Sequence, residues 1–455
     1  MKCRYVHSKE VVKTNRFDGS YHNAESNIYD SVISAHSLHP LSFYCSNIFT
    51  SGRNRRVYTK PEYGYPFLSN SDASSQDPFG TCNYSSRKYG YDEDALLKGG
   101  MILTGRVGAI GQTSFVPKYW EKLNTMGSDN IIRIVVKPEY KNGFIYAFLA
   151  SKMGNLLFWK QATGGGQPFI NDTMVGSLPI PQMPEAFQQE VDDLIQESAR
   201  LREEATDALN EAKKTLSDYI GINFALTQGC KIGLIQNKSL TSSIQTSFCS
   251  HSFLNNSVAA FERIKDKCQL LGSCKVDVWY PGMFKRAYVN NGLPYMQGSS
   301  IFETNPFRRC AHLSKARTPK LDELWLKENY ILITCAGSLG QVKIITKEYE
   351  DKMAIGSPDI IRVFSKDSLF TNEFLFAYLQ LPLVQDYMQS FKYGSVIERF
   401  DALRVKSIPI IIPTKEISDS VTDLIRYYKD CTYKSFCKEE KAISMVEQEI
   451  EKWNK

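Results

Sequence analysis

The strongest constraint on this chain is that its sequence repeats itself. Residues 64–68 (GYPFL) reappear 228 positions later as residues 292–296 (GLPYM). Residues 102–112 (ILTGRVGAIGQ) match residues 331–341 (ILITCAGSLGQ) at an offset of 229. Because this offset drifts by so little over more than a hundred residues, the pattern predicts two copies of one domain.

Each copy has the same predicted plan. Short runs rich in Ile and Val, bounded by turn residues, predict strands. A helical segment, a glycine-containing loop and a short apolar strand with proline follow. In the first copy these segments are 101–104, 131–136, 143–159, 163–166 and 178–181, and in the second they are 330–334, 360–364, 373–391, 393–395 and 408–413.

A long polar helix is predicted after each domain. In the first, apolar and small residues recur at alternating spacings of three and four, which is a heptad seam. The second helix has a similar seam at both ends, but the seam is irregular around residues 432–440. The expected seam residues are Val191, Leu194, Leu201, Ala205, Ala208, Ala212, Val421, Leu424, Ile443, Val446 and Ile450.

A single apolar stripe on a charged helix is not stable alone, so we expect the two helices to pack on each other. Two like units in a self-complementary contact imply a pseudo-two-fold axis and an antiparallel coiled coil. The predicted fold class is therefore α+β, with two tandem mixed α/β domains. The expected ranges are 1–183 for the first domain, 184–220 for the central helix, 221–413 for the second domain and 414–455 for the C-terminal helix.

The composition indicates a globular chain in a reducing compartment. The 11 cysteines are an odd number and include no Cys-x-x-Cys pair, so neither a disulfide framework nor a zinc site is expected. No apolar run is long enough to span a membrane, and the first residues do not resemble a secretion signal. We expect a cytoplasmic protein without a membrane partner.

The net charge of +6 is unevenly distributed. Residues 184–220 carry −6 and residues 414–455 carry −1, so the two domains together carry +13. Positive charge on the domains, and not on the helices, is expected of domains that face a polyanion.

Basic and polar loops recur at matching places in the two copies. Residues 53–58 (RNRRVY) correspond to 283–288 (MFKRAY), and 83–88 (NYSSRK) correspond to 312–317 (HLSKAR). Such side chains contact phosphates and base edges, although each cluster alone could equally be a solvated surface. The candidate DNA-binding residues are Arg53, Arg55, Arg56, Arg87, Lys88, Arg106, Gln167, Lys285, Arg286, Arg308, Arg309, Lys315 and Lys392.

The usual motifs of catalysis are missing from the sequence. It contains no phosphate-binding Gly-x-x-x-x-Gly-Lys loop, no Gly-x-Ser-x-Gly elbow and no His-Glu-x-x-His zinc helix. We therefore expect no catalytic residue and no metal ligand on this chain.

The doubled segment ending in Gly-x-Ile/Leu-Gly-Gln, the doubled Leu/Ile-Pro-Ile strand and the helix that follows resemble the specificity (S) subunits of type I restriction-modification systems. The resemblance covers nearly the whole chain. It implies a subunit that reads double-stranded DNA, one half of a split target per domain, and has no catalysis of its own. It also implies two adenine-methyltransferase (M) subunits and restriction (R) subunits as partners.

In that case S-adenosylmethionine, and ATP with Mg²⁺, belong to the partner subunits, and this chain holds no cofactor. Because the loops of the two domains differ, we expect an asymmetric target. Two hypotheses of different classes stay open beside this one. One is a two-domain nuclease or methyltransferase with an unrecognised site, and the second is a scaffold that binds only proteins through its helices.

Overall fold

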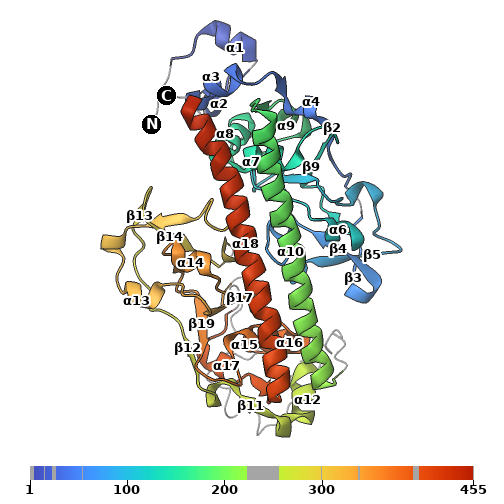
Figure 1. Ribbon diagram of the computed structural model, residues 1–455, viewed down its shortest axis with the longest axis vertical. Coiled ribbons are helices and arrows are strands. Elements are labelled where there is room, and N and C mark those ends of the chain that lie inside the picture. Colours follow the sequence, from blue (N-terminus) through green and yellow to red (C-terminus); the bar gives the residue numbers. More distant parts are fainter. Residues whose placement is uncertain are drawn as a thin grey trace. The chain divides into compact units, whose positions relative to one another are not determined.

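The computed structural model describes residues 5–14, 16–22, 27–53, 55–222, 256–298, 300–336, 339–392 and 399–453. The chain divides into two compact units. Unit 1 comprises Met1–Glu203 together with Lys434–Lys455, and unit 2 comprises Glu204–Tyr433. Each of the two long helices, α10 (Glu185–Ile220) and α18 (Lys415–Trp453), therefore contributes one half to each unit (Figure 1).

Unit 1 contains three small sheets, with strand orders β2-β9-β6-β7, β3-β5-β4-β8 and β1-β10. Its strands are β1 His39–Pro40, β2 Cys45–Thr50, β3 Tyr58–Thr59, β4 Gly64–Leu68, β5 Asn83–Ser86, β6 Ile102–Gly105, β7 Thr113–Phe115, β8 Met126–Gly127, β9 Ile131–Val136 and β10 Pro179–Ile180. Its shorter helices are α1 Ser8–Thr14, α2 Gly19–His22, α3 Asn27–Ala35, α4 Leu41–Tyr44, α5 Asn70–Ala73, α6 Lys118–Lys122, α7 Asn142–Ala150, α8 Lys152–Gln161 and α9 Asp172–Gly176.

Unit 2 repeats these sheets in the same order, as β12-β19-β16-β17, β13-β15-β14-β18 and β11-β20. Its strands are β11 Cys268–Leu270, β12 Val276–Trp279, β13 Tyr288–Val289, β14 Leu293–Met296, β15 Ala311–Leu313, β16 Ile331–Thr334, β17 Val342–Ile344, β18 Ile355–Gly356, β19 Ile360–Ser365 and β20 Pro409–Ile411. Its shorter helices are α12 Asn256–Arg263, α13 Leu321–Leu324, α14 Lys347–Asp351, α15 Asn372–Leu379, α16 Pro382–Gln389 and α17 Ala402–Lys406.

The register of the sheets is repeated as well. Leu103 pairs with Arg133 in unit 1, and Leu332 pairs with Arg362 in unit 2. Even the parallel pair recurs, as β4 with β8 and as β14 with β18. The predicted two tandem mixed α/β domains are confirmed.

One buried arginine ties two sheets together in each unit. Arg133 on β9 is fully buried and donates from Nη2 to the carbonyl oxygens of Gly127 (2.6 Å) and Ala95 (3.0 Å), and from Nη1 to that of Ile131 (2.9 Å). A Cβ at Gly127 would lie only 3.0 Å from Arg133 Nη2, so glycine allows the close approach. Burial lowers the pKa of Arg133 to about 10, so the guanidinium remains charged at neutral pH.

Unit 2 contains the same arrangement around Arg362. Its Nη2 donates to the carbonyl oxygen of Gly356 (3.0 Å), and its Nη1 donates to those of Ile360 (2.6 Å) and Ser357 (3.1 Å). Burial lowers the pKa of Arg362 to about 10 as well. Each buried arginine with the carbonyl oxygens that it binds is called an arginine clamp. The clamp of Arg362 fixes the short turn between β18 and β19, and the clamp of Arg133 fixes the turn between β8 and β9.

The long helices run antiparallel to each other in both units. In unit 1 Ser198 contacts Ser435 through their hydroxyls (2.9 Å), and Glu190 pairs with Lys441 (3.6 Å). In unit 2 the hydroxyl of Tyr427 donates to Glu204 (2.8 Å). The positions on α18 thus decrease as those on α10 increase, and the predicted antiparallel pairing is confirmed.

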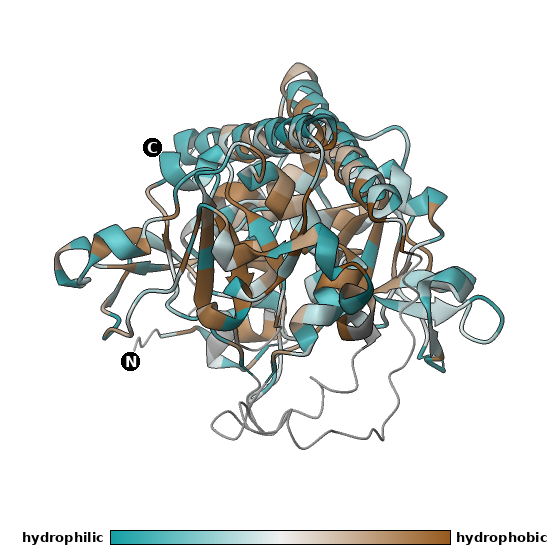
Figure 2. Cartoon of the chain, turned by 90° about the horizontal axis from the view of Figure 1, so that it is seen from below, coloured by the Kyte–Doolittle hydropathy of each residue, from teal (hydrophilic) through white to brown (hydrophobic). Residues whose placement is uncertain are grey.

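The core of unit 1 lies between the sheet β2-β9-β6-β7, the helices α7 and α8, and the two long helices. Ile33, Ile102, Ile134 and Phe148 belong to this one apolar cluster. In Figure 2 the strands at the centre are largely coloured as hydrophobic, whereas the long helices carry many hydrophilic residues. The long helices therefore complete the domain core and are not separate rods.

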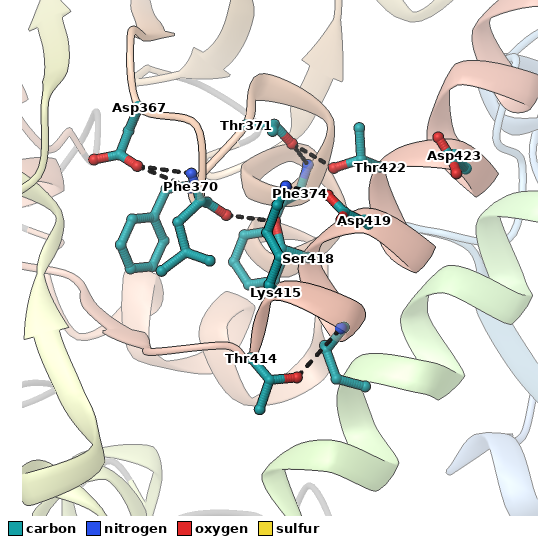
Figure 3. Close-up of polar contacts among 12 residues, drawn as sticks. Asp367, Phe370, Thr371, Phe374, Thr414, Lys415, Ser418, Asp419, Thr422 and Asp423 are labelled. Atoms are coloured by element: carbon teal, nitrogen blue, oxygen red, sulfur yellow. Dashed lines mark hydrogen bonds and ion pairs between the residues drawn. The ribbon is translucent and has the colours of Figure 1, made fainter.

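In both units the first helix after the large sheet docks on a long helix through a polar contact. In unit 1 the backbone N–H of Gly143 donates to the carboxylate of Asp192 (2.7 Å). In unit 2 the hydroxyls of Thr371 and Thr422 meet at 2.7 Å, and the Ser418 hydroxyl donates to the carbonyl oxygen of Leu369 (Figure 3). These contacts fix where the long helix lies on its domain.

The prediction of one helix over 143–159 and one over 373–391 is wrong, because each segment forms two helices. Ser151 is extended and caps α8 through its hydroxyl, which accepts from the backbone N–H of Gly154 (3.1 Å). In unit 2 Pro382 begins α16 at the first helical position, where proline is tolerated but the preceding helix cannot continue through it.

Candidate nucleic-acid interface

Arg56 of the first basic loop is held by an acidic residue between β8 and β9. Its Nη2 lies 2.5 Å from Oδ1 of Asp129, and its guanidinium carbon lies 5.8 Å from the centre of the Phe67 ring on β4. The hydrogen bond to Asp129 raises the pKa of Arg56. The side chain of Asp129 is only 12% exposed, whereas that of Arg56 is 47% exposed, so a fixed carboxylate holds an accessible cation.

The same three parts recur in unit 2. Arg286 Nη2 lies 3.8 Å from Oδ2 of Asp359, and its guanidinium carbon lies 5.7 Å from the centre of the Tyr295 ring on β14. Arg286 Nε also donates to the Tyr295 hydroxyl (2.7 Å). The two arginines are 230 positions apart. At the offset of 229 that relates Arg133 to Arg362, Asp359 takes the place of Asn130, so the two aspartates lie one position apart in equivalent turns.

Other predicted residues of unit 1 gather at the same end of the large sheet. Arg53 is 89% exposed and its Nε lies 3.6 Å from Asp129, and Arg55 is also exposed. Arg106 follows β6, and its backbone N–H donates to the carbonyl oxygen of Asn130 (2.8 Å). Gln167 lies at the exposed tip of a loop whose next segment, at Ile170, bonds back to the carbonyl oxygen of Arg106 (2.9 Å).

Glycines shape the turn beside Arg106. Gly108 and Gly111 have φ of +76° and +70°, which other residues rarely adopt. In this first copy both glycines lie in the segment that connects β6 to β7. In the second copy Gly340 has φ of +81°, while residues 337–338 lie outside the described residues.

Arg87 and Lys88 lie in the turn after β5, and both are exposed. The Arg87 guanidinium carbon lies 5.3 Å from the Tyr65 ring centre, and Lys88 Nζ lies 5.0 Å from that of Tyr89. Tyr89 is itself exposed. Exposed cations on aromatic rings can contact both phosphates and base faces.

The remaining predicted residues of unit 2 are less clearly grouped. Lys285 is exposed next to Arg286, and Lys315 is exposed in the turn after β15. Arg308 is half-buried and Arg309 is exposed in the segment before β15. Lys392 follows α16, and the predicted glycine loop 393–395 lies outside the described residues.

The predicted helix seam is buried almost throughout. Val191, Leu194, Ile443, Val446 and Ile450 belong to the apolar core cluster of unit 1. Leu424 is half-buried, and the other predicted seam residues, Leu201, Ala205, Ala208, Ala212 and Val421, are buried.

Buried polar pairs interrupt the seam. In unit 1 Glu439 accepts from Arg202 Nη1 and from the Tyr146 hydroxyl, each at 3.0 Å. In unit 2 Lys429 of α18 donates from Nζ to Glu373 of α15 (3.0 Å), which joins the long helix to the domain. The sequence did not predict these pairs, because a polar residue breaks the apolar heptad pattern from which the helix contact was predicted.

A buried titratable pair on β17 and α14 belongs to unit 2 alone. Burial lowers the pKa of Lys343 to about 8, and burial also raises the pKa of Glu348. Lys343 Nζ lies 5.3 Å from the centre of the Tyr349 ring. Both side chains are covered, so the pair packs the domain and does not face a substrate.

Within the described residues, no group of three or more His, Cys, Asp or Glu side chains could hold a metal ion. No helix in the described part of the chain is both long enough and apolar enough to cross a membrane.

Two tandem copies of one mixed α/β domain, each ending in a long helix and each presenting a paired arginine, define a duplicated recognition protein. A family model described as "Type I restriction modification DNA specificity domain" matches residues 45–201 and 283–431. The chain belongs to this family, and each of its units carries one copy of the domain.

Solved structures of S subunits resemble the chain over most of its length. The type I restriction-modification S subunit from M. genitalium is 13% identical, covers 91% of this chain and 94% of its own, and has a TM-score of 0.33. The HsdS subunit from Thermoanaerobacter tengcongensis is also 13% identical, covers 90% and 95%, and has a TM-score of 0.27. No curated protein sequence matches the chain.

Proposed function

We propose that this chain is the DNA specificity subunit of a type I restriction-modification complex and has no active site of its own. It reads double-stranded DNA with two domains, one for each half of a split target. The observation that carries this proposal is the arginine, aspartate and aromatic ring that recur in both family domains.

The two faces differ in their side chains, which supports an asymmetric target. Arg106 corresponds to Cys335 in the second copy, and Arg53 corresponds to Met283. Arginine can donate two hydrogen bonds to guanine, whereas exposed Met283 offers an apolar contact of the kind that suits a thymine methyl group, and Cys335 donates its thiol to the carbonyl oxygen of Asp359. Different chemistry at equivalent places favours different half-site sequences.

The long helices serve as the connection between the two readers. The 36 residues of α10 span about 54 Å, which is comparable with one to two turns of DNA. We propose that the outer faces of α10 and α18 dock two methyltransferase (M) subunits, and that restriction (R) subunits join when the complex cuts. S-adenosylmethionine, and ATP with Mg²⁺, then belong to those partners, and the complex works in the cytoplasm.

Co-expression with the cognate methyltransferase subunit, followed by mapping of N6-methyladenine in the host DNA, tests the proposal. The expected motif has two different halves separated by a fixed gap. A palindromic motif would contradict the asymmetric target.

The purified chain alone tests whether the protein is an enzyme. It should neither methylate nor cut DNA, and either activity would show that it has an active site. The complex with M subunits tests whether the protein is only a scaffold. This complex should bind specific duplex with an affinity that falls with salt, because phosphate contacts release counterions. If the complex does not bind DNA, only the hypothesis of a protein-binding scaffold remains.

A further inference from the structure

The two arginine–aspartate pairs are built unlike ordinary surface ion pairs. The aspartates sit in the short turns after β8 and β18, directly beside the buried arginine clamps of Arg133 and Arg362. In unit 2 the N–H and the thiol of Cys335 also donate to the carbonyl oxygen of Asp359, at 3.4 and 3.0 Å. The carboxylates are thus attached to backbone that cannot readily move.

The arginines are held from two sides but keep an open edge. Asp129 accepts a hydrogen bond from Arg56, whereas Asp359 lies 3.8 Å from Arg286, which donates instead to the Tyr295 hydroxyl. The ring of Phe67 or Tyr295 lies within 6 Å of each guanidinium carbon. The side chains of Arg56 and Arg286 are still 47% and 31% exposed. A guanidinium held in this way has already lost much of its conformational entropy, which lowers the cost of a directional contact.

The charge of the pair distinguishes a base contact from a phosphate contact. A phosphate approaching Arg56 would also approach the Asp129 carboxylate, and the repulsion would offset much of the attraction. The O6 and N7 atoms of guanine are uncharged acceptors, so they meet the free N–H groups without that repulsion. Neighbouring Arg55 is exposed and suits a phosphate better.

We infer that Asp129 and Asp359 are positioning residues that aim Arg56 and Arg286 at a guanine in the major groove. Each half-site then contains one G·C pair that is read by its domain through this arginine. The inference rests on the proposed function, because it assumes that both domains face DNA.

The test uses the complex of the full chain with its M subunits and a library of duplexes that vary in both half-sites. Arg56→Lys keeps the charge but removes the two-pronged donor. Guanine preference at one position of one half-site should fall by about 5- to 150-fold, with little change in the affinity for non-specific duplex.

Asp129→Asn should relax the same position while raising the affinity for non-specific duplex at low salt. Arg56, and Arg53 that also pairs with Asp129, can then contact phosphates, so the slope of log affinity against log salt should steepen by up to about 0.9 for each arginine. Arg286→Lys and Asp359→Asn should act in the same way on the other half-site only.

Asp277→Asn is the matched control. Asp277 pairs with exposed Lys366 (2.7 Å), which follows β19 at the end opposite to Asp359. This variant removes one carboxylate from an ion pair of the same domain and should leave every base preference and the salt slope unchanged.

The outcomes separate the inference from the proposed function. If the unmodified complex shows no sequence preference, the proposed function fails. If the complex is specific but Arg56→Lys and Asp129→Asn leave each base preference intact, the inference is overturned. A uniform loss of affinity with Arg56→Ala and no loss of preference with Arg56→Lys would show a phosphate contact and would also overturn it.

Discussion

The polar pair between Arg202 and Glu439 is the sharpest test of how the two long helices recognise each other. The side chain of Glu439 is 4% exposed and that of Arg202 is 14% exposed, so the pair is largely removed from water. Glu439 also accepts the hydroxyl of Tyr146 from α7, and it therefore connects both helices to the domain. The perturbation is Glu439→Leu.

Glu439→Leu removes an acceptor from two donors and leaves the charge of Arg202 in a buried place. Breaking a buried ion pair by removing one partner costs about 3–5 kcal/mol. The loss of the acceptor for Tyr146 is part of that sum and is not added to it, because contacts within one network are not independent.

The chain supplies its own matched replacement. At the offset of 230, Thr432 corresponds to Arg202 and Leu209 corresponds to Glu439. Both Thr432 and Leu209 are buried, so the second repeat packs this place without an ion pair. The double variant Arg202→Thr, Glu439→Leu should therefore lie within about 1–2 kcal/mol of the unmodified protein, because a buried pair replaced as a whole is often nearly neutral.

Native-state hydrogen exchange is the suitable assay, since it reports the opening free energy of α18 residues 435–450 without assuming that the whole chain unfolds in one step. The single variant should lose about 3–5 kcal/mol of protection there, and the double variant should regain most of it. Arg202→Thr alone completes the comparison. If the double variant loses as much protection as Arg202→Thr and Glu439→Leu added together, the two side chains do not interact and the reasoning is wrong.

Three further predictions concern the domains. Arg133→Met should lower the free energy of unfolding, measured in urea, by at least about 3 kcal/mol, because several buried carbonyl groups lose their donor. The control Arg55→Met, at an exposed position, should change it by less than about 0.5 kcal/mol. Equal effects of the two variants would show that the arginine clamp does not stabilise the domain. Gly143→Val should lower the melting temperature, since a Cβ there would lie 2.7 Å from Asp192 Oδ1 and 3.0 Å from the Cβ of Ile195, while Gly165→Ala has nothing within 4 Å and should not lower it. Lys343 has a pKa of about 8 in the folded protein against 10.5 ordinarily. Between pH 8 and pH 10.5 the unfolded chain therefore binds more protons than the folded chain. The free energy of unfolding should rise by about 3 kcal/mol as the pH increases across this range. Lys343→Met should remove this rise in urea titrations, and curves that stay parallel to those of the unmodified protein would contradict it.

The repeat allowed most of the fold to be predicted. The offset of 228–230 placed equivalent strands, and the structure gives both copies the same sheets in the same order. Helix breaks were harder to predict, because Ser151 interrupts an otherwise helical pattern only by turning its hydroxyl to the next helix. The irregular seam near residues 432–440 is a continuous helix, since Thr432, Ser435 and Glu439 are buried polar residues of the contact.

The candidate site was predictable in composition but not in its pairing. Arg56 and Arg286 stood out as basic residues at matching places, whereas Asp129 and Asp359 looked like ordinary turn residues. At the offset of 229 that holds around β8 and β9, Asp359 corresponds to Asn130, so the repeat did not mark the two aspartates as equivalent. A contact between residues more than seventy positions apart becomes visible only when the sheets bring the turns together.

The division of α18 between two cores has a consequence for how the protein is made. Ala442, Ile443, Val446 and Ile450 complete the cluster that also holds Ile33 and Leu41. At roughly 5–20 residues per second, the ribosome needs roughly 12–50 s to travel from residue 203 to the C-terminus. The first domain to be synthesised is therefore the last to be finished, and until then its apolar core lacks the side chains of α18.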